Sequence, residues 1–165
     1  MSEKITPEVV EAFFFEAMMH GYATEVEPFL NIPLPGWKTI SYENESLQLV
    51  DMWHTTPNSD YSSGVITIFR KDMPIWVMHF GGWYKKSAIQ FLKNALMHSF
   101  ENRKFTGGRG PFSLESEGLT YKNIVILNSF VEFYGHEKIT SETDGFLGTH
   151  WYRGMWLADP TLAIG

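Results

Sequence analysis

The sequence predicts an α+β fold in which one α-β-β-β unit occurs twice, with an antiparallel sheet packed by two helices under pseudo-twofold symmetry. Three observations predict this fold. Apolar residues recur at helical spacing in two segments. Runs rich in β-branched and aromatic residues follow each of these segments. Residues of the first half also match residues of the second half at nearly constant offsets.

The first helix is expected from Thr6 to about His20. Thr6 is a favoured N-cap residue, and Pro7 suits the first helical position because its fixed φ matches the helix. Gly21 is expected to end the helix, since glycine adopts the left-handed C-cap conformation readily. The side chains predicted to face the core are Val10, Phe13, Phe14, Ala17 and Met18.

The second helix is expected to begin near Ser87. Ser87 and Gln90 have the spacing of a capping box, in which each side chain bonds the backbone N–H of the other residue. Ala88, Leu92, Ala95 and Leu96 follow at helical spacing and are predicted to face inward.

Six strands are predicted from runs of β-branched and aromatic residues separated by turn-forming residues. Three lie between the helices, at 47–53, 65–69 and 74–80, and three follow the second helix, at 119–127, 130–140 and 146–151. The strand at 74–80 carries apolar groups on both faces. It is therefore predicted to be central and covered on each side, with His79 as a buried histidine that needs a hydrogen-bond partner.

A comparison of the two halves predicts an internal duplication. The helices match at an offset of 78 residues, which superposes His20 on His98. The strands match at offsets of 71 to 73. The matched strand pairs are Leu47 with Leu119, Asp51 with Asn123, Gly64 with Gly135, Gly81 with Gly154, and Trp83 with Trp156. We therefore predict a single domain over 1–165, built from repeats at approximately 6–84 and 85–158.

Composition excludes several classes of protein. The chain has 165 residues, of which 44% are hydrophobic and 19% charged, so it has enough apolar material for a core. A net charge of −6 argues against nucleic-acid binding, which needs clustered Lys and Arg. The absence of cysteine excludes disulfides, thiolate metal sites and a cysteine nucleophile. With no signal-peptide pattern and no long apolar run, we expect no membrane partner and a cytoplasmic location.

A small-molecule-binding or sensing module is the function that the sequence favours. Aromatic residues make up 16% of the chain, more than a minimal core needs, and pockets often lie between structural units. We expect an aromatic cavity between the repeats, with three tryptophans as walls and three polar anchors. The predicted ligand-binding residues are Trp53, Trp76, His79, Glu137, Trp151 and Arg153.

Two other functions stay open at this point. A hydrolase would use His54, in the polar loop before Gly64, together with Asp51 or Asp60 as its carboxylate partner. No serine lies in a G-x-S-x-G elbow, so we assign no catalytic residue. An interaction protein would form a homodimer through a sheet edge or an aromatic patch.

We predict no metal and no cofactor. The six histidines form neither H-E-x-x-H nor an H-x-H pair, and His20 and His98 suit the capping of helix C-termini better than ligation. The segment 107–111 combines glycines with Arg109 and has the composition of an anion-binding nest. It lacks the ending of a P-loop, so a plain loop is favoured.

The chain resembles a bacterial family of domains of unknown function that often follow an XRE-type helix-turn-helix module. The resemblance is carried by residues 14–17, 21–23, 47–51 and 74–82 in the first half, and by 109–111, 119–121, 133–139 and 152–154 in the second. Members of that family show a G-x-E-x-V or G-x-E-x-I strand in both halves. Here the second half keeps Glu137 in that pattern, whereas the first half has Ile66. The resemblance implies a free-standing version with a signal-sensing role.

Overall fold

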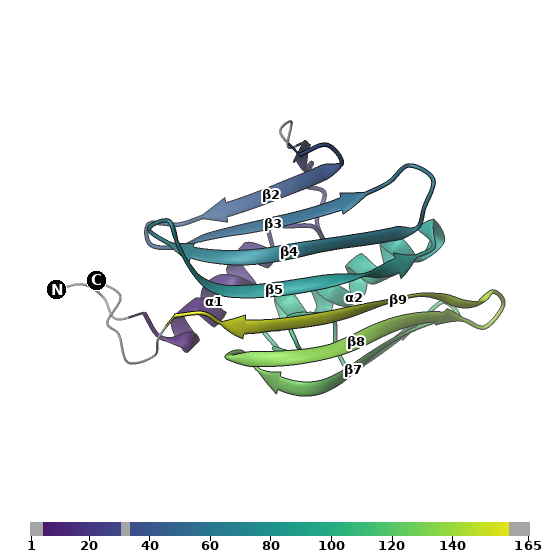
Figure 1. Ribbon diagram of the computed structural model, residues 1–165. Coiled ribbons are helices and arrows are strands. Elements are labelled where there is room, and N and C mark those ends of the chain that lie inside the picture. The colour runs from purple at the N-terminus through teal and green to yellow at the C-terminus, as the bar shows by residue number, and fades with distance from the viewer. Residues whose placement is uncertain (1–4, 31–33, 159–165) are drawn as a thin grey trace.

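The computed structural model describes residues 5–30 and 34–158, which form one large antiparallel sheet with helices on one of its faces (Figure 1). Within these residues there are two α-helices, Pro7–Met18 (α1) and Ile89–Glu101 (α2), and a short 3-10 turn, Lys86–Ala88, leads into α2. The nine strands in the same residues are Phe29–Leu30 (β1), Trp37–Glu43 (β2), Gln48–Thr55 (β3), Tyr61–Arg70 (β4), Met73–Tyr84 (β5), Ser113–Ser116 (β6), Leu119–Ser129 (β7), Glu132–Ser141 (β8) and Gly145–Trp156 (β9). The predicted α+β class is confirmed.

The sheet consists of two meanders joined at its centre. The strand order is β1-β2-β3-β4-β5-β9-β8-β7-β6, and every neighbouring pair is antiparallel. The central pair is β5 and β9, the last strand of each meander, with Phe80 opposite Tyr152. Both helices lie behind this sheet in Figure 1, so they cover the same face. The strand directions therefore bring residues from the end of each half together at the middle of the molecule.

Alternation along each strand divides the side chains between a buried inner face and an open outer face. On β5, Trp76, Met78 and Phe80 point toward the helices and are buried, whereas His79 is exposed. The prediction that β5 is covered on both faces is therefore wrong, because both helices pack on one side. His79 is a surface residue rather than a buried one for the same reason.

The helix boundaries agree closely with the sequence, but the capping details differ. Thr6 is the N-cap of α1 and Pro7 its first residue, as predicted, although the Thr6 side chain makes no capping hydrogen bond. The prediction of a capping box at Ser87 is wrong. Ser87 lies inside the 3-10 turn, and the N-cap of α2 is Ala88, whose side chain has no hydrogen-bonding group.

The six predicted strands correspond to β3, β4, β5, β7, β8 and β9, but each meander holds more than three strands. β2 adds a full strand before β3, and β6 adds a short one before β7. The predicted match of Gly81 with Gly154 is also wrong, because a Cβ on Gly81 would meet the outer-face ring of Trp151, whereas one on Gly154 would meet the buried ring of Phe133. The internal duplication itself stays a proposal.

An aromatic core fills the space between the second meander and α1. The rings of Phe130 and Phe133 both stack on Trp76, and Phe14 of α1 packs against the same indole. The Trp76 Nε1–H donates to the carbonyl oxygen of Phe130 at 2.9 Å, so its one polar group is satisfied. This part of the interior is therefore closed.

Candidate functional site

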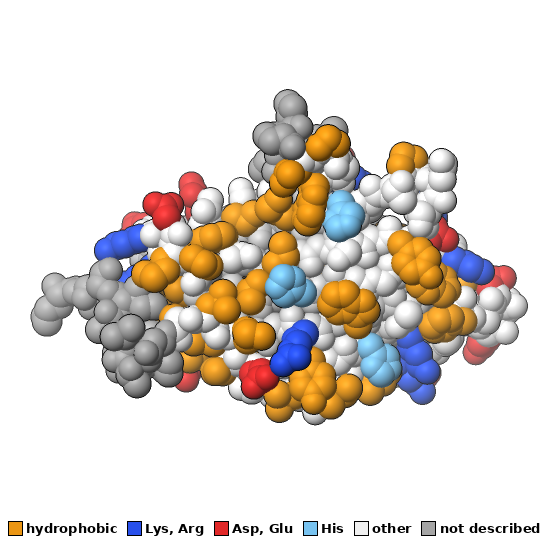
Figure 2. Space-filling model, in the orientation of Figure 1, with side chains coloured by type: hydrophobic (Ala, Val, Ile, Leu, Met, Phe, Trp, Pro, Cys, Tyr) orange, Lys and Arg blue, Asp and Glu red, His pale blue; other side chains and the backbone are white. Residues whose placement is uncertain are grey.

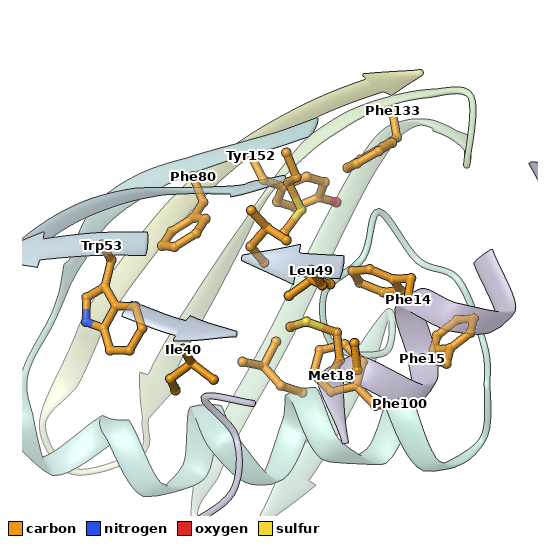
Figure 3. Close-up of a cluster of buried hydrophobic side chains, with 14 of the residues drawn as sticks. Phe14, Phe15, Met18, Ile40, Leu49, Trp53, Phe80, Phe100, Phe133 and Tyr152 are labelled. Carbon is orange, nitrogen blue, oxygen red and sulfur yellow. The ribbon is translucent and has the colours of Figure 1, made fainter. Parts of the chain in front are cut away.

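A cavity of about 510 Å³ lies between the first meander and the helices. It is within the usual size range of small-molecule pockets. Trp53, Ile40 and Phe80 point from their strands toward the helix side, as Figure 3 shows. Exposed residues mark its mouth, namely Asp60 at the end of the β3–β4 loop, Tyr61 at the start of β4 and Lys86 at the start of the 3-10 turn.

The walls of the cavity are apolar and aromatic. The sheet side presents Ile40 from β2, Trp53 from β3, Ile66 from β4 and Phe80 from β5, all buried. The helix side presents Met18 from α1 and Leu92, Leu96 and Phe100 from α2, and Tyr22 covers one end with its ring edge toward Trp53. These walls suit an apolar or flat aromatic body.

Four buried polar residues line the inner end of the cavity, and we call them the polar floor: Asp51, Tyr84, Arg109 and His150. They come from β3, β5, the loop after α2, and β9. The floor therefore combines both meanders, because the β5–β9 pairing brings the two halves together there.

Arg109 of the floor is paired with Glu137 of β8, which is fully buried. The guanidinium donates from Nε to Oε2 at 3.1 Å and from Nη2 to Oε1 at 2.5 Å, a two-point geometry that holds a carboxylate firmly. Tyr121 donates its hydroxyl to Oε2 as well, at 2.5 Å. Burial alone would raise the pKa of Glu137, but the charge and hydrogen bonds of Arg109 lower it, so this carboxyl is ionised at neutral pH.

The loop 105–110 carries Arg109 into the interior, and its residues 106–110 are all buried. Gly107 and Gly108 both have positive φ, which glycine adopts without strain. The Asn123 side-chain amide donates to the carbonyl oxygens of Thr106 and Gly110, each at 2.9 Å. The loop is thus anchored on the second meander, and its Arg109 guanidinium binds the Glu137 carboxylate rather than an external anion.

Two residues of the floor have a buried polar atom that makes no hydrogen bond to any residue the structure describes. These atoms are Asp51 Oδ1 and His150 Nδ1, whereas the Tyr84 hydroxyl interacts with the Glu137 carboxylate. The other ring nitrogen of His150, Nε2, lies 3.3 Å from the Ser62 hydroxyl. Unpartnered buried polar atoms are costly, and here both belong to residues that line one cavity.

Burial controls the ionisation of this floor. It raises the pKa of Asp51 to about 7, although the nearby Arg109 charge opposes the rise. It lowers the pKa of His150 to about 4, with Arg109 acting in the same direction. The Tyr84 pKa is raised, mainly by burial and by the charge of Glu137. His150 and Tyr84 are therefore neutral near pH 7, and Asp51 is the group that titrates there.

The six residues predicted to bind a ligand do not line one cavity. Trp53 forms a wall of the cavity, and Glu137 lies behind the polar floor as the partner of Arg109. Trp76 is sealed in the aromatic core.

His79, Trp151 and Arg153 lie instead on the outer face, where His79 pairs with Arg153 across β5 and β9. Trp151 is 53% exposed and Arg153 makes a loose ion pair with Glu132 at 3.5 Å. Figure 2 shows this face, which is largely apolar with few charged side chains near its middle. The predicted homodimer, which would use such a surface, stays a prediction.

The residues of a hydrolase are not brought together. On β3, Asp51 points inward and His54 outward, where its ring packs on Trp37. Asp60 stands at the cavity mouth, which His54 does not line. In the described parts of the chain, no three His, Asp or Glu side chains are grouped as metal ligands.

Sequence reasoning missed Tyr84 and His150 as site residues and treated Arg109 as part of a loop. One signal was available for Asp51. It alternates with Leu49 and Trp53 on the inward side of a strand, so its burial follows from period-two spacing.

The fold and site define an α+β protein with a hollow, aromatic-walled interior and a buried polar floor. A family model, described as a domain of unknown function (DUF5680), matches residues 58–155. The chain therefore belongs to this family. The match spans β4 to β8 entirely and all of β9 except Trp156, and it includes Tyr84, Arg109, Glu137 and His150 but stops short of Asp51. Comparison with curated proteins and with solved structures found no match. No helix in the described ranges has the length and apolarity needed to cross a membrane.

Proposed function

We propose that this protein binds a small molecule in the cavity between the first meander and the helices. The observation that carries the proposal is the polar floor, where Asp51 and His150 leave polar atoms unpartnered beside an apolar space of about 510 Å³. Proteins rarely keep such atoms buried without a partner, whereas binding sites combine apolar walls with a few polar groups that fix orientation.

The closed aromatic core around Trp76 supports the same proposal by contrast. The second meander fills its inner space with the loop 105–110 and with aromatic rings that contact one another. The first meander instead leaves room next to polar side chains. An opening that served packing alone would be expected to collapse, because voids in cores are destabilising.

A sensing role in the cytoplasm, with the ligand reporting a state of the cell, is the biological setting we infer. Its support is the resemblance to bacterial domains that follow helix-turn-helix modules.

We also infer that the two meanders descend from one duplicated segment. Corresponding positions support this, since Gly64 lies under Phe80 of β5 as Gly135 lies under Tyr152 of β9, and in both places a Cβ would clash with the ring.

Fluorine NMR of protein labelled with 5-fluorotryptophan tests the proposed binding. The chain has six tryptophans, of which Trp53 forms a cavity wall and Trp151 lies on the outer face. In a screen of small aromatic fragments, we expect binders to shift the Trp53 resonance and leave the Trp151 resonance in place. A screen in which no fragment moves Trp53 would remove the proposal.

Two variants make this experiment specific. Ile40→Phe adds a ring to the cavity wall and is expected to weaken every fragment that shifts Trp53. Ile126→Phe makes the same change at a residue of β7 that is 61% exposed, and it is expected to leave binding unchanged. Equal effects of both variants would show that the fragments bind elsewhere.

A further inference from the structure

We propose that the cavity takes a ligand with a positively charged nitrogen group, such as an amidinium, on a flat apolar body, and that the carboxylate of Asp51 binds this group. The inference rests on the proposed function and names the chemical class of its ligand. It makes Asp51 a ligand-binding residue, a role that does not follow from the cavity alone.

The balance of buried charges is the first argument. Around the polar floor, the described residues place two carboxyl groups, Asp51 and Glu137, against one guanidinium, Arg109. Glu137 accepts hydrogen bonds from both Nε and Nη2 of that guanidinium, and Tyr121 donates a third to it. Asp51 is left without a cation of its own, and a buried carboxylate without a cation is unstable. A ligand cation would supply the missing charge.

The second meander shows how the corresponding position is satisfied when no ligand is needed. Asn123 stands on β7 opposite Glu137, as Asp51 stands on β3 opposite Ile66. The Asn123 amide donates to two carbonyl oxygens of the loop 105–110 and accepts a hydrogen bond from Tyr152 at 2.7 Å. An aspartate accepts where an asparagine donates. The group above Asp51 must therefore present hydrogen-bond donors, as the N–H groups of a nitrogen cation do, and no described residue of the chain donates to Oδ1.

The walls favour a flat cation. Trp53 lies on the same strand as Asp51, Phe80 lies on β5 two strands away, and Tyr22 lines the same cavity. Aromatic faces attract cations, and they pack well against planar bodies. The Lys93 ammonium already lies 5.0 Å from the centre of the Tyr22 ring at the edge of the cavity, which shows this attraction in the protein itself.

Charges at the mouth do not change this assignment. Lys38, Lys86 and Lys93 line the outer part of the cavity together with Asp60. All four are partly or fully exposed, so water and salt screen them. Asp51 is buried, and its charge acts at close range in a poorly screened interior. The ligand is therefore expected to carry its cationic group at one end, rather than along its whole length.

Three nearly isosteric probes test the inference: benzamidine, which is cationic, benzamide, which is neutral, and benzoate, which is anionic. Their dissociation constants are measured by the fluorine shift of Trp53 in the wild-type protein and in Asp51→Asn. Benzamidine is expected to bind the wild type roughly tenfold more tightly than benzamide, as charge-assisted hydrogen bonds require. Asp51→Asn is expected to abolish that preference. Asp60→Asn, which removes the exposed carboxylate at the mouth, is expected to keep it.

The preference is also expected to depend on pH. Below about pH 7 the binding of benzamidine should weaken roughly tenfold per pH unit, because Asp51 must lose its proton to bind a cation. His150 and Glu137 keep their charge states between pH 5 and 8, so they do not mimic this change. The other titratable groups facing the cavity are Tyr22, Tyr61, Tyr84, Arg109, Lys38, Lys86, Lys93 and Asp60.

The outcomes separate this inference from the proposed function. If benzamide or benzoate binds as tightly as benzamidine does, as judged from the Trp53 titration, the cavity binds ligands but the cationic class is wrong. The same holds if none of the three probes binds while neutral fragments of the screen do. A preference that survives in Asp51→Asn would also overturn the role of this carboxylate. If no compound of any charge moves Trp53, both proposals fall together.

Discussion

Glu137→Gln is expected to lower the free energy of unfolding by about 3–5 kcal/mol, the usual cost of breaking a buried ion pair from one side. The variant keeps the size of the side chain but removes its charge, which leaves the Arg109 guanidinium buried and uncompensated. Arg109 and Tyr121 would both lose a carboxylate acceptor. Urea unfolding monitored by tryptophan fluorescence measures the change.

The chain offers a matched control for this prediction. Glu132→Gln breaks an exposed ion pair, with Arg153, in which both side chains are more than half exposed and the atoms are 3.5 Å apart. Exposed pairs contribute little, so this variant is expected to change the free energy of unfolding by less than about 1 kcal/mol. If the two substitutions cost the same, Glu137 is not the electrostatic anchor described above.

Asp51→Asn is expected to produce the second large effect, a gain in the free energy of unfolding that depends on pH. The folded protein raises the pKa of Asp51 from 3.8 to about 7, so between these values the folded state holds a proton that the unfolded state has released. The contribution of Asp51 to the free energy of unfolding is therefore fully present below pH 3.8 and is lost as the pH rises to about 7. Asp51→Asn removes the titration. Its stability relative to the wild type is expected to rise across this window by up to about 4 kcal/mol and then to level off.

Comparison of the variant with the wild type at each pH isolates the contribution of Asp51. His150 acts with the opposite sign, because its lowered pKa gives stability above pH 6.5 that is lost as the pH falls toward 4. His150 is present in both proteins, so its contribution cancels in the difference. Urea midpoints at half-unit steps from pH 4.5 to pH 8.5 provide the data. A difference that stays flat across this range would mean that Asp51 is not buried as described.

Local spacing was enough to predict much of the fold. The helical period of 3.6 residues places Phe14 and Leu92 on buried helix faces. Runs of β-branched and aromatic residues locate the six longest strands of the sheet. β2 was missed because its sequence, WKTISYE, mixes charged and apolar residues in a manner common to loops and edge strands. Which face of the sheet the helices cover is a tertiary property, so the strand pattern of β5 alone assigned His79 to the wrong environment.

The candidate site was harder to predict because its parts are distant in the sequence. Asp51 and Trp53 come from one strand, but Arg109 reaches the same place through the buried loop after α2, and His150 through the central β5–β9 pairing. A glycine-rich loop with one arginine occurs in many structural settings. The position of the Arg109 guanidinium follows only from the hydrogen bonds by which Asn123 anchors the loop 105–110. Trp53 could be predicted, because an inward aromatic residue on a strand of the first meander faces the cavity by alternation.

The measurement that tests the cavity most directly is an isotope-filtered NOE experiment on the protein with a bound aromatic fragment. Ligand protons are expected to show contacts with methyl groups of Ile40, Ile66, Leu92 and Leu96, which line the cavity from the sheet and from α2. Ile126 of the same chain, 61% exposed, serves as the internal reference. Contacts confined to Ile126 and other exposed methyl groups would contradict the account, since the ligand would then bind a surface and not the interior.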